Sequence, residues 1–222
     1  MTALIVGGTS GLGLEIADLL KSRYDNVVIT GRKDPKVKGL TFAALPLGSG
    51  QGFPIPMDHL VTDHAPFDTV VYNPGFYQEG RISDLTDKQI LDMVNVGFLG
   101  AAMLMQRILK SQGTLRRFVA ITSTSQWTPR ELEPVYTGVK AALGMFANSL
   151  SLDKRIERTL VAAPAGMKTP FWEGLSKDTS AMLEPKWVAD QICIHLYFKG
   201  SYSYCYLRIL RDPPRTEIVE TR

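Results

Sequence analysis

Tyr136 and Lys140 are the residues of this sequence whose types and spacing point most directly to chemistry. On a helix, a spacing of four residues puts both side chains on one face, one turn apart. Because a lysine ammonium favours a nearby phenolate, we expect the pKa of Tyr136 to lie below its ordinary value of about 10. Such a phenol can donate or accept a proton near neutral pH, as carbonyl reduction or alcohol oxidation requires. The spacing also occurs by chance, so the pair needs support from other features.

A glycine-rich turn near the start of the chain gives the first support. Gly7, Gly11 and Gly13 lie between an apolar run and an amphipathic stretch. Glycines there allow a tight turn, a close approach of the backbone to a pyrophosphate, and close packing of helix on strand. Thr9 and Ser10 add hydroxyl donors beside the helix N-terminus, whose free N–H groups attract phosphate. No Gly-Lys-Ser/Thr ending follows, which disfavours a nucleoside-triphosphate P-loop.

The end of the second expected strand bears on cofactor choice. In an NAD-binding fold an acidic residue usually lies about 20 residues after the glycines, and this sequence has Arg32 and Lys33 there instead. A carboxylate would repel a ribose 2′-phosphate, whereas the guanidinium of Arg32 can bind one with two parallel hydrogen bonds. The sequence therefore favours NADP(H), with NAD(H) as the alternative.

The elements that must position these residues alternate along the chain. Short apolar runs and amphipathic stretches predict an α/β fold, a doubly wound, mostly parallel sheet with helices on both faces. We expect strands at residues 3–6, 27–30, 68–72, 118–121, 159–162 and 204–210, and helices at residues 12–23, 86–111, 185–197 and from Tyr136 to about residue 151. The second of these helices opens with a capping box at Thr86.

Two segments do not follow this alternation. Residues 33–56 are rich in glycine and proline and show no clear amphipathic helix, so we expect a shortened or absent crossover helix. Residues 212–222 are predicted to be a polar tail after the last strand, and residues 1–211 a single domain. Tyr202, Tyr204 and Tyr206 alternate as in a strand, and we expect an exposed tyrosine face on an edge strand that contacts another subunit.

Composition narrows the classes of function. The chain has 222 residues, 45% hydrophobic and 21% charged, and a formal net charge of +3 too small to indicate a nucleic-acid partner. Cys193 and Cys205 lack metal or redox spacing and suit a reducing cytosol, and the three histidines lack metal-ligand spacing. We expect a cytoplasmic protein without a metal, since neither a signal peptide nor an apolar run of 18 residues is visible.

The glycine turn together with Tyr136 and Lys140 resembles the short-chain dehydrogenase/reductase family in its single-domain form, over almost the whole chain. The family pairs a Gly-x-x-x-Gly-x-Gly turn with a Tyr-x-x-x-Lys helix. Its catalytic serine lies about 13 residues before the tyrosine, where this chain has Ser123 at a strand end. Its helix asparagine, in an Asn-x-x-Gly setting, resembles Asn95.

The resemblance implies a role for each of these residues. Tyr136 would be the general acid in reduction and the base in oxidation, while Lys140 would lower its pKa and hold the nicotinamide ribose. Ser123 would polarise the substrate carbonyl, and Asn95 would hold a helix distortion and a water that leads to Lys140. Cofactor contacts would come from the glycine turn, the end of the second strand, an acidic residue near adenine and two later loops: Gly7, Thr9, Ser10, Gly11, Leu12, Gly13, Arg32, Asp58, Asn73, Pro74, Gly75, Tyr136, Lys140, Pro164, Met167 and Thr169.

The sequence is therefore interpreted as an NADP(H)-dependent oxidoreductase that acts on a small carbonyl or alcohol substrate. Phe76, Tyr77, Trp127, Phe171 and Trp172 fall in loops around the nicotinamide end and indicate an apolar or aromatic substrate. The alternatives are an NAD-dependent alcohol dehydrogenase and a dinucleotide-sensing protein without turnover. The family also implies a homodimer or homotetramer.

Overall fold

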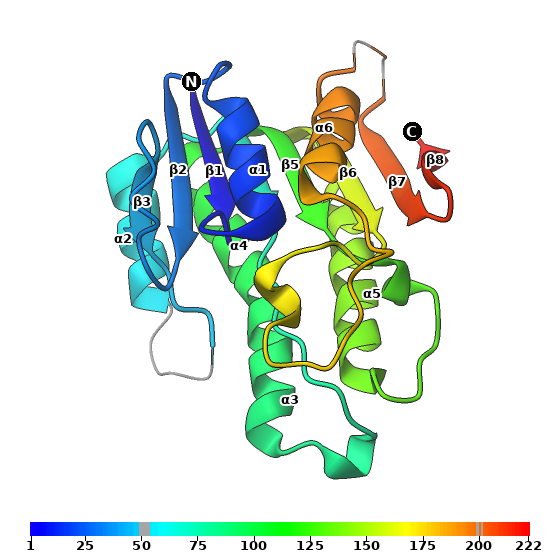
Figure 1. Ribbon diagram of the computed structural model, residues 1–222. Coiled ribbons are helices and arrows are strands. Elements are labelled where there is room, and N and C mark those ends of the chain that lie inside the picture. Colours follow the sequence, from blue (N-terminus) through cyan, green and yellow to red (C-terminus); the bar gives the residue numbers. More distant parts are fainter. Residues whose placement is uncertain (49–53, 199, 201) are drawn as a thin grey trace.

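The computed structural model describes residues 1–48, 54–198, 200 and 202–222, and it contains one continuous sheet (Figure 1). The strand order is β3-β2-β1-β4-β5-β6-β7-β8, parallel except for the last pair, β7 and β8. The strands are β1 (Thr2–Val6), β2 (Asn26–Gly31), β3 (Thr41–Ala44), β4 (Thr69–Tyr72), β5 (Leu115–Ile121), β6 (Ile156–Pro164), β7 (Tyr204–Arg211) and β8 (Pro214–Thr221). The α/β fold expected from the sequence is confirmed.

Helices cover both faces of the sheet (Figure 1). Two of them pack with one buried apolar cluster on one face, and three pack with a second cluster on the other face. The first group is α1 (Gly11–Leu20) and α6 (Pro185–Leu196), and the second is α2 (Pro54–His64), α4 (Gly100–Gln112) and α5 (Pro134–Leu150). A further helix, α3 (Asp87–Val94), extends below the sheet and continues into α4 through a π-helical segment, Asn95–Leu99.

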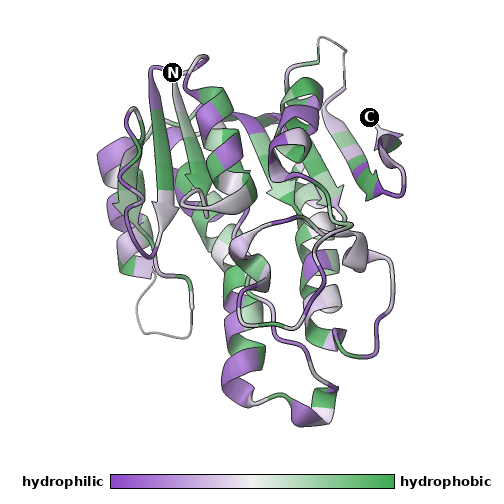
Figure 2. Cartoon of the chain, in the orientation of Figure 1, coloured by the Kyte–Doolittle hydropathy of each residue, from purple (hydrophilic) through white to green (hydrophobic). Residues whose placement is uncertain are grey.

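The central strands are apolar because both of their faces are covered. Residues Ala3 to Val6 of β1 are fully buried, and β4 is buried along its whole length. A strand with helices on both sides carries a continuous apolar run rather than alternating residues. The apolar strands lie inside and the polar helix faces outside, as Figure 2 shows.

The segment after β2 differs from a regular crossover. Residues 32–40 contain no helix, and the chain passes directly from β2 to the parallel strand β3. The expected loss of the crossover helix is confirmed for this part, while residues 49–53 lie outside the described chain. Neither β3 nor α2 was predicted from the sequence. Helix α2 was hard to recognise because two prolines lie in its first turn and polar residues interrupt its apolar face.

The predictions for the end of the chain were wrong. Residues 212–222 are no free polar tail, because Pro214–Thr221 forms the antiparallel edge strand β8 against β7. The tyrosines of β7 therefore do not lie on an edge, and Tyr204 is only 2% exposed. A hairpin after a parallel sheet reverses the chain within a few residues, and its polar, alternating strand suits a solvated edge.

Residues 87–112 form one helical stretch that is long and apolar enough, by length and composition alone, to cross a membrane. In the structure this stretch packs on the sheet, with Ala101, Leu104, Met105 and Ile108 buried. The core helix of a globular protein meets the same criterion, so this stretch is explained by its packing.

Candidate active site

A cavity of about 1170 Å³ lies at the carboxyl ends of the parallel strands. Its centre is the point where the strand order reverses, since β1 pairs with β2 on one side and β4 on the other. Open α/β sheets bind ligands at such a reversal. The segments that carry the predicted site residues line this cavity.

The glycine turn between β1 and α1 has the backbone geometry that only glycine adopts easily. Gly7 and Gly11 have φ values of +73° and +52°. A Cβ on Gly13 would lie 2.1 Å from the carbonyl oxygen of Gly7, so the helix start packs directly on the turn. The side-chain amide of Asn73 donates to the same oxygen at 3.0 Å and holds the turn from β4. The turn thus presents backbone and the start of α1 to the cavity.

The end of β2 supplies an unsatisfied hydroxyl and a cation to the same cavity. Thr30 is 1% exposed, and its Oγ1 has no hydrogen-bond partner although the residue lines the cavity. The next lining residues are Gly31 and Arg32, and within the described chain Arg32 forms no ion pair with a carboxylate. An orphaned buried hydroxyl, a guanidinium and a glycine cradle together fit the adenosine ribose and phosphates of a dinucleotide.

Tyr136 and Lys140 lie one turn apart on α5, as predicted, and both line the other end of the cavity. Helix α5 begins with Pro134, which is well suited to the first turn because it needs no N–H partner. The Lys140 ammonium is buried, donates to the carbonyl oxygen of Ile121 at 3.1 Å, and lies 5.7 Å from the centre of the Tyr136 ring. Ser123, just after β5, lies close enough to the Tyr136 phenol to act on its pKa.

The electrostatics of the pair differ from the sequence prediction. Burial raises the pKa of Tyr136 well above 10, and the hydrogen bond with Ser123 only partly opposes this. Burial also lowers the pKa of Lys140, to about 8. The expected depression of the Tyr136 pKa by Lys140 is therefore wrong for this structure, because desolvation of the phenol dominates. A phenol with this pKa keeps its proton at neutral pH and can donate it to an oxygen that gains charge.

The predicted helix distortion at Asn95 is present. Residues Asn95–Leu99 form a π-helical turn, in which the Gly100 N–H bonds to the Asn95 carbonyl oxygen five residues earlier. Gly97 in this turn faces α5, and a Cβ there would lie 2.2 Å from the Val139 side chain. The π turn therefore sets how closely the helix before β5 approaches the helix that carries Tyr136.

Most of the predicted site residues meet in this cavity, and three do not. Gly13 is buried beneath the turn, Asn95 is half-buried outside the lining, and Asp58 lies on the exposed side of α2. Asp58 forms an ion pair with Arg107 at 2.7 Å, so the expected position near an adenine ring is wrong. The lining residues predicted from the sequence are Gly7, Thr9, Ser10, Gly11, Leu12, Arg32, Asn73, Pro74, Gly75, Ser123, Tyr136, Lys140, Pro164, Met167 and Thr169.

The structure also adds residues that the sequence analysis did not assign to the site. Leu45 and Leu47, which follow β3, line the nucleotide end where Asp58 was expected. Glu133 lines the opposite end, three residues before Tyr136. The position of Glu133, three residues before Tyr136, was the signal that could have identified it. Leu45 and Leu47 could not be identified in this way, because the four residues of β3 are too few to be recognised as a strand.

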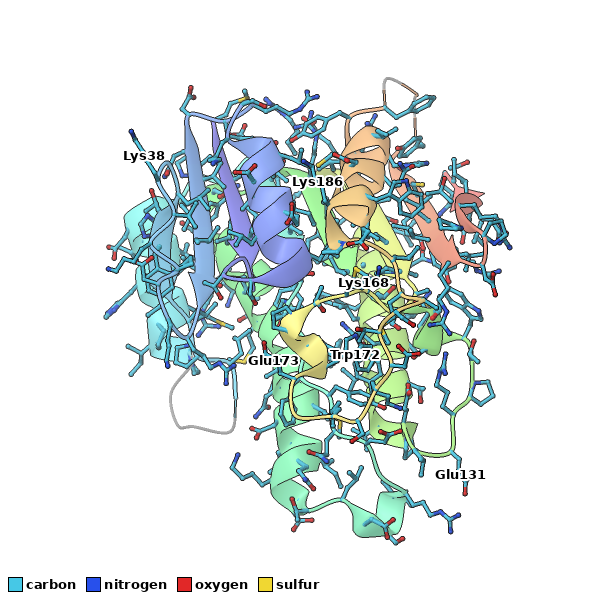
Figure 3. The ribbon with its side chains drawn as sticks, in the orientation of Figure 1. Lys38, Glu131, Lys168, Trp172, Glu173 and Lys186 are labelled. Carbon is cyan, nitrogen blue, oxygen red and sulfur yellow. The ribbon has the colours of Figure 1, made fainter. Side chains whose placement is uncertain are left out.

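The segment after β6 closes the cavity from the front. It passes across the carboxyl ends of the strands and carries Trp172 and Glu173 (Figure 3). The Trp172 indole donates to the carbonyl oxygen of Met167 at 2.9 Å, and a backbone bridge joins Met167 to Leu183. Among the described residues, no group of three histidine, cysteine or acidic side chains is arranged to hold a metal ion.

Comparisons with known proteins agree with this geometry. Residues 1–180 match the family model of short chain dehydrogenases. The chain is 27% identical to an uncharacterized oxidoreductase of Staphylococcus epidermidis, over 86% of this chain and 88% of that protein. It is 27% identical to the NADP-dependent (R)-specific alcohol dehydrogenase of Lentilactobacillus kefiri, over 78% and 75% of the two chains. A solved structure of a short chain dehydrogenase/reductase family protein superimposes with a TM-score of 0.83, at 23% identity and 95% coverage of both chains.

The family match covers both the glycine turn and the helix with Tyr136 and Lys140. The resemblance noted from the sequence is thereby confirmed. The cavity lies at the strand reversal, and a phenol, a hydroxyl and an ammonium lie at one end of it. This arrangement suits the hydride chemistry of a nicotinamide cofactor. This chain belongs to the short-chain dehydrogenase/reductase family, whose members are oxidoreductases that use a nicotinamide dinucleotide.

Proposed function

We propose that the protein is an NADPH-dependent carbonyl reductase in which Tyr136 is the general acid. The observation that carries the proposal is one continuous cavity, with Arg32 and the glycine turn at one end and Tyr136, Ser123 and Lys140 at the other. The nicotinamide cofactor supplies the hydride when it is bound. The residues of this chain supply the proton and the polar contacts to the reacting oxygen.

The raised pKa of Tyr136 suits the role of proton donor, which is the role that carbonyl reduction needs. A phenol that stays protonated near pH 7 can hydrogen-bond a carbonyl oxygen and transfer its proton as that oxygen gains negative charge. Ser123 lies beside the same phenol and can donate a second hydrogen bond to the carbonyl oxygen. The buried Lys140 ammonium lies near enough to stabilise the phenolate that remains.

Recognition of the 2′-phosphate would fall to Arg32 and the hydroxyl of Thr30. Both residues line the cavity at the end of β2, where an acidic residue would have opposed a phosphate. The NADP dependence named for the Lentilactobacillus relative supports this preference.

The cofactor test is a titration of the protein with NADPH and NADH, followed by quenching of tryptophan fluorescence. We expect NADPH to bind more tightly, and Arg32→Ala to weaken NADPH by about tenfold or more, because a charged hydrogen bond contributes about 1.5–3 kcal/mol. Lys33→Ala is the matched control, since Lys33 is exposed and lies outside the cavity lining. Equal affinity for both cofactors would contradict the preference.

The catalytic test replaces the phenol alone. Tyr136→Phe should keep NADPH affinity and lower kcat for carbonyl reduction by about 10²- to 10⁴-fold, the usual contribution of a positioned proton donor. Turnover by Tyr136→Phe at the wild-type rate would contradict the assigned role. Tight NADPH binding without turnover of any carbonyl compound would favour a dinucleotide-sensing protein instead.

A further inference from the structure

Four aromatic rings form a continuous wall at the Tyr136 end of the cavity. Tyr77 contacts the Tyr136 ring edge-on at a centroid distance of 5.2 Å, and Phe171 and Trp172 at 5.8 Å and 5.6 Å. Phe171 in turn lies 5.0 Å from Trp172. The rings come from three separate segments, so the fold assembles this wall beside the reacting phenol. Aromatic faces attract cations as well as apolar groups.

A carboxylate lies within this wall. The side chain of Glu133 is 14% exposed, and it lines the cavity three residues before Tyr136. It accepts hydrogen bonds from the hydroxyls of Tyr77, at 3.2 Å, and Ser125, at 3.1 Å. Arg130, which also lines the cavity, forms an ion pair with Glu133 at 3.6 Å, and its side chain is 45% exposed. Two carboxylate oxygens offer about four acceptor positions, so these partners leave capacity for another donor.

The rim of the same end carries further negative charge. Glu173 and Asp178 are exposed lining residues, and within the described chain neither has an ion-pair partner. Lys177 is paired with Glu79 at 2.8 Å, which leaves little free positive charge there. Among the other cationic lining residues, Arg130 is paired with Glu133, Lys88 is paired with Asp92, and Lys140 is buried beside Tyr136. The exposed carboxylates of Glu173 and Asp178, which form no ion pair within the described chain, would therefore favour the approach of a cationic substrate over an anionic one at this rim.

We propose that the substrate is a carbonyl compound that carries a positively charged amine, and that Glu133 and the aromatic wall recognise this amine. The inference rests on the proposed reductase function, because it places the carbonyl at Tyr136 and the cation a few ångströms further along the wall. A carboxylate held by two hydroxyls, together with ring faces, is the chemistry by which proteins bind substituted ammonium groups. The sequence predicted an apolar or aromatic substrate, and this proposal adds that the substrate carries a positive charge.

The test uses two ketones of nearly the same shape, one cationic and one neutral. Because the ammonium group also makes the carbonyl more electrophilic, the change of their ratio on substitution of Glu133 is the decisive quantity. Phenacyltrimethylammonium is the cation, and 3,3-dimethyl-1-phenylbutan-1-one, with a tert-butyl group in place of trimethylammonium, is its neutral isostere. With NADPH, we expect kcat/KM for the cation to exceed that for the isostere by about tenfold. Glu133→Gln keeps the shape and one acceptor oxygen, and it should reduce this ratio by about tenfold, mainly through the KM of the cation.

Glu131→Gln is the matched control. Glu131 lies two residues away on the exposed loop before α5, is paired with Arg81 outside the cavity, and should leave both ketones unaffected (Figure 3). An equal loss for both ketones in Glu133→Gln would show that the carboxylate only holds the loops together, and would overturn the proposal. So would a wild-type preference for the neutral ketone.

Ligand binding measured without turnover separates this inference from the reductase function. Quenching of tryptophan fluorescence by each ketone reports occupancy of the wall, since Trp172, one of the three tryptophans of the chain, lines the cavity. Binding of the cation but not the isostere, without reduction of either, would overturn the reductase function and keep the recognition site. Reduction of both ketones without discrimination in either measurement would overturn the recognition site and keep the function.

Discussion

Burial decides the protonation of the two groups at the reacting end. Lys140 is 4% exposed and its pKa is lowered to about 8, while the pKa of Tyr136 is raised, in both cases by desolvation. The two shifts have the same physical origin and opposite signs, because the charged form is the acid in lysine and the base in tyrosine. The free enzyme thus holds a neutral phenol beside an ammonium that titrates in the mildly alkaline range.

This arrangement predicts the pH dependence of carbonyl reduction. As pH rises through about 8, Lys140 loses the charge that stabilises the phenolate, so kcat/KM should be level below that value and fall above it. The profile of kcat/KM between pH 6 and 10 reports this group, since kcat/KM follows ionisations of the free enzyme. In Lys140→Arg, the kcat/KM of any remaining activity should not fall above pH 8, because a guanidinium stays charged there. A rate that rises steadily to pH 10 would contradict the assignment.

The π turn is the element that couples two helices at the site. It adds one residue to the turn between α3 and α4 and brings Gly97 against α5, where the Val139 side chain occupies the space of a missing Cβ. Val139 precedes Lys140, so the fit between these helices bears directly on the position of the ammonium. The π turn has hydrogen bonds between residues five apart in place of the regular ones between residues four apart, and it thereby allows the close approach of the two helices.

Gly97→Ala should therefore damage the site through packing. We expect a loss of about 1–3 kcal/mol in the free energy of unfolding, the usual cost of overpacking, with a lower kcat because α5 is displaced. Gly138→Ala is the control on the same helix pair, since a Cβ there meets nothing within 4 Å. It should raise stability by up to about 1 kcal/mol, because alanine favours a helix interior. Urea unfolding and turnover measured on both variants check the contrast, and equal behaviour would contradict it.

At the scale of the molecule, β8 completes the sheet. It pairs along most of β7, and Arg222 contacts Asn148 in the last turn of α5 and Ser151 just after this helix. Tyr204 and Leu207 of β7 belong to the two apolar clusters on opposite faces of the sheet. The end of the chain therefore stabilises the strand next to β6 and the last turn of α5.

Removal of residues 212–222 should lower the melting temperature and expose the edge of β7. Without β8, the edge of β7 would expose apolar residues and unpaired backbone N–H and C=O groups to other chains. We therefore expect aggregation at temperatures where the full chain is monodisperse. Thermal unfolding with light scattering measures both effects. As a control, Arg215→Ala removes an exposed ion pair with Glu217 and exposed hydrogen bonds to the carbonyl oxygens of Asp212 and Pro213. It keeps the pairing of β8 and should change the free energy of unfolding by no more than about 0.5 kcal/mol. A truncated chain as stable as the full one would show that β8 is dispensable.

The α/β class, most of the strands and helices, the glycine turn and the Tyr136–Lys140 pair could all be predicted from the sequence. These features are local: hydrophobic periodicity, capping residues and fixed spacings on one helix or turn carry them. The sequence also indicated the distortion at Asn95, through a spacing similar to that of the family.

The remaining features could not be predicted from the sequence, because each depends on residues that are distant along the chain and come together only in the folded protein. The pKa of Tyr136 reverses the expected direction since burial by several segments outweighs one nearby ammonium. Asp58 is replaced at the nucleotide end by Leu45 and Leu47 because β3, a strand of four residues, redirects the chain. Strand β8 and the carboxylate of Glu133 acquire their roles from partners on β7 and on the loop that carries Tyr77. Local pattern fixes which elements form, and packing fixes what surrounds each functional group.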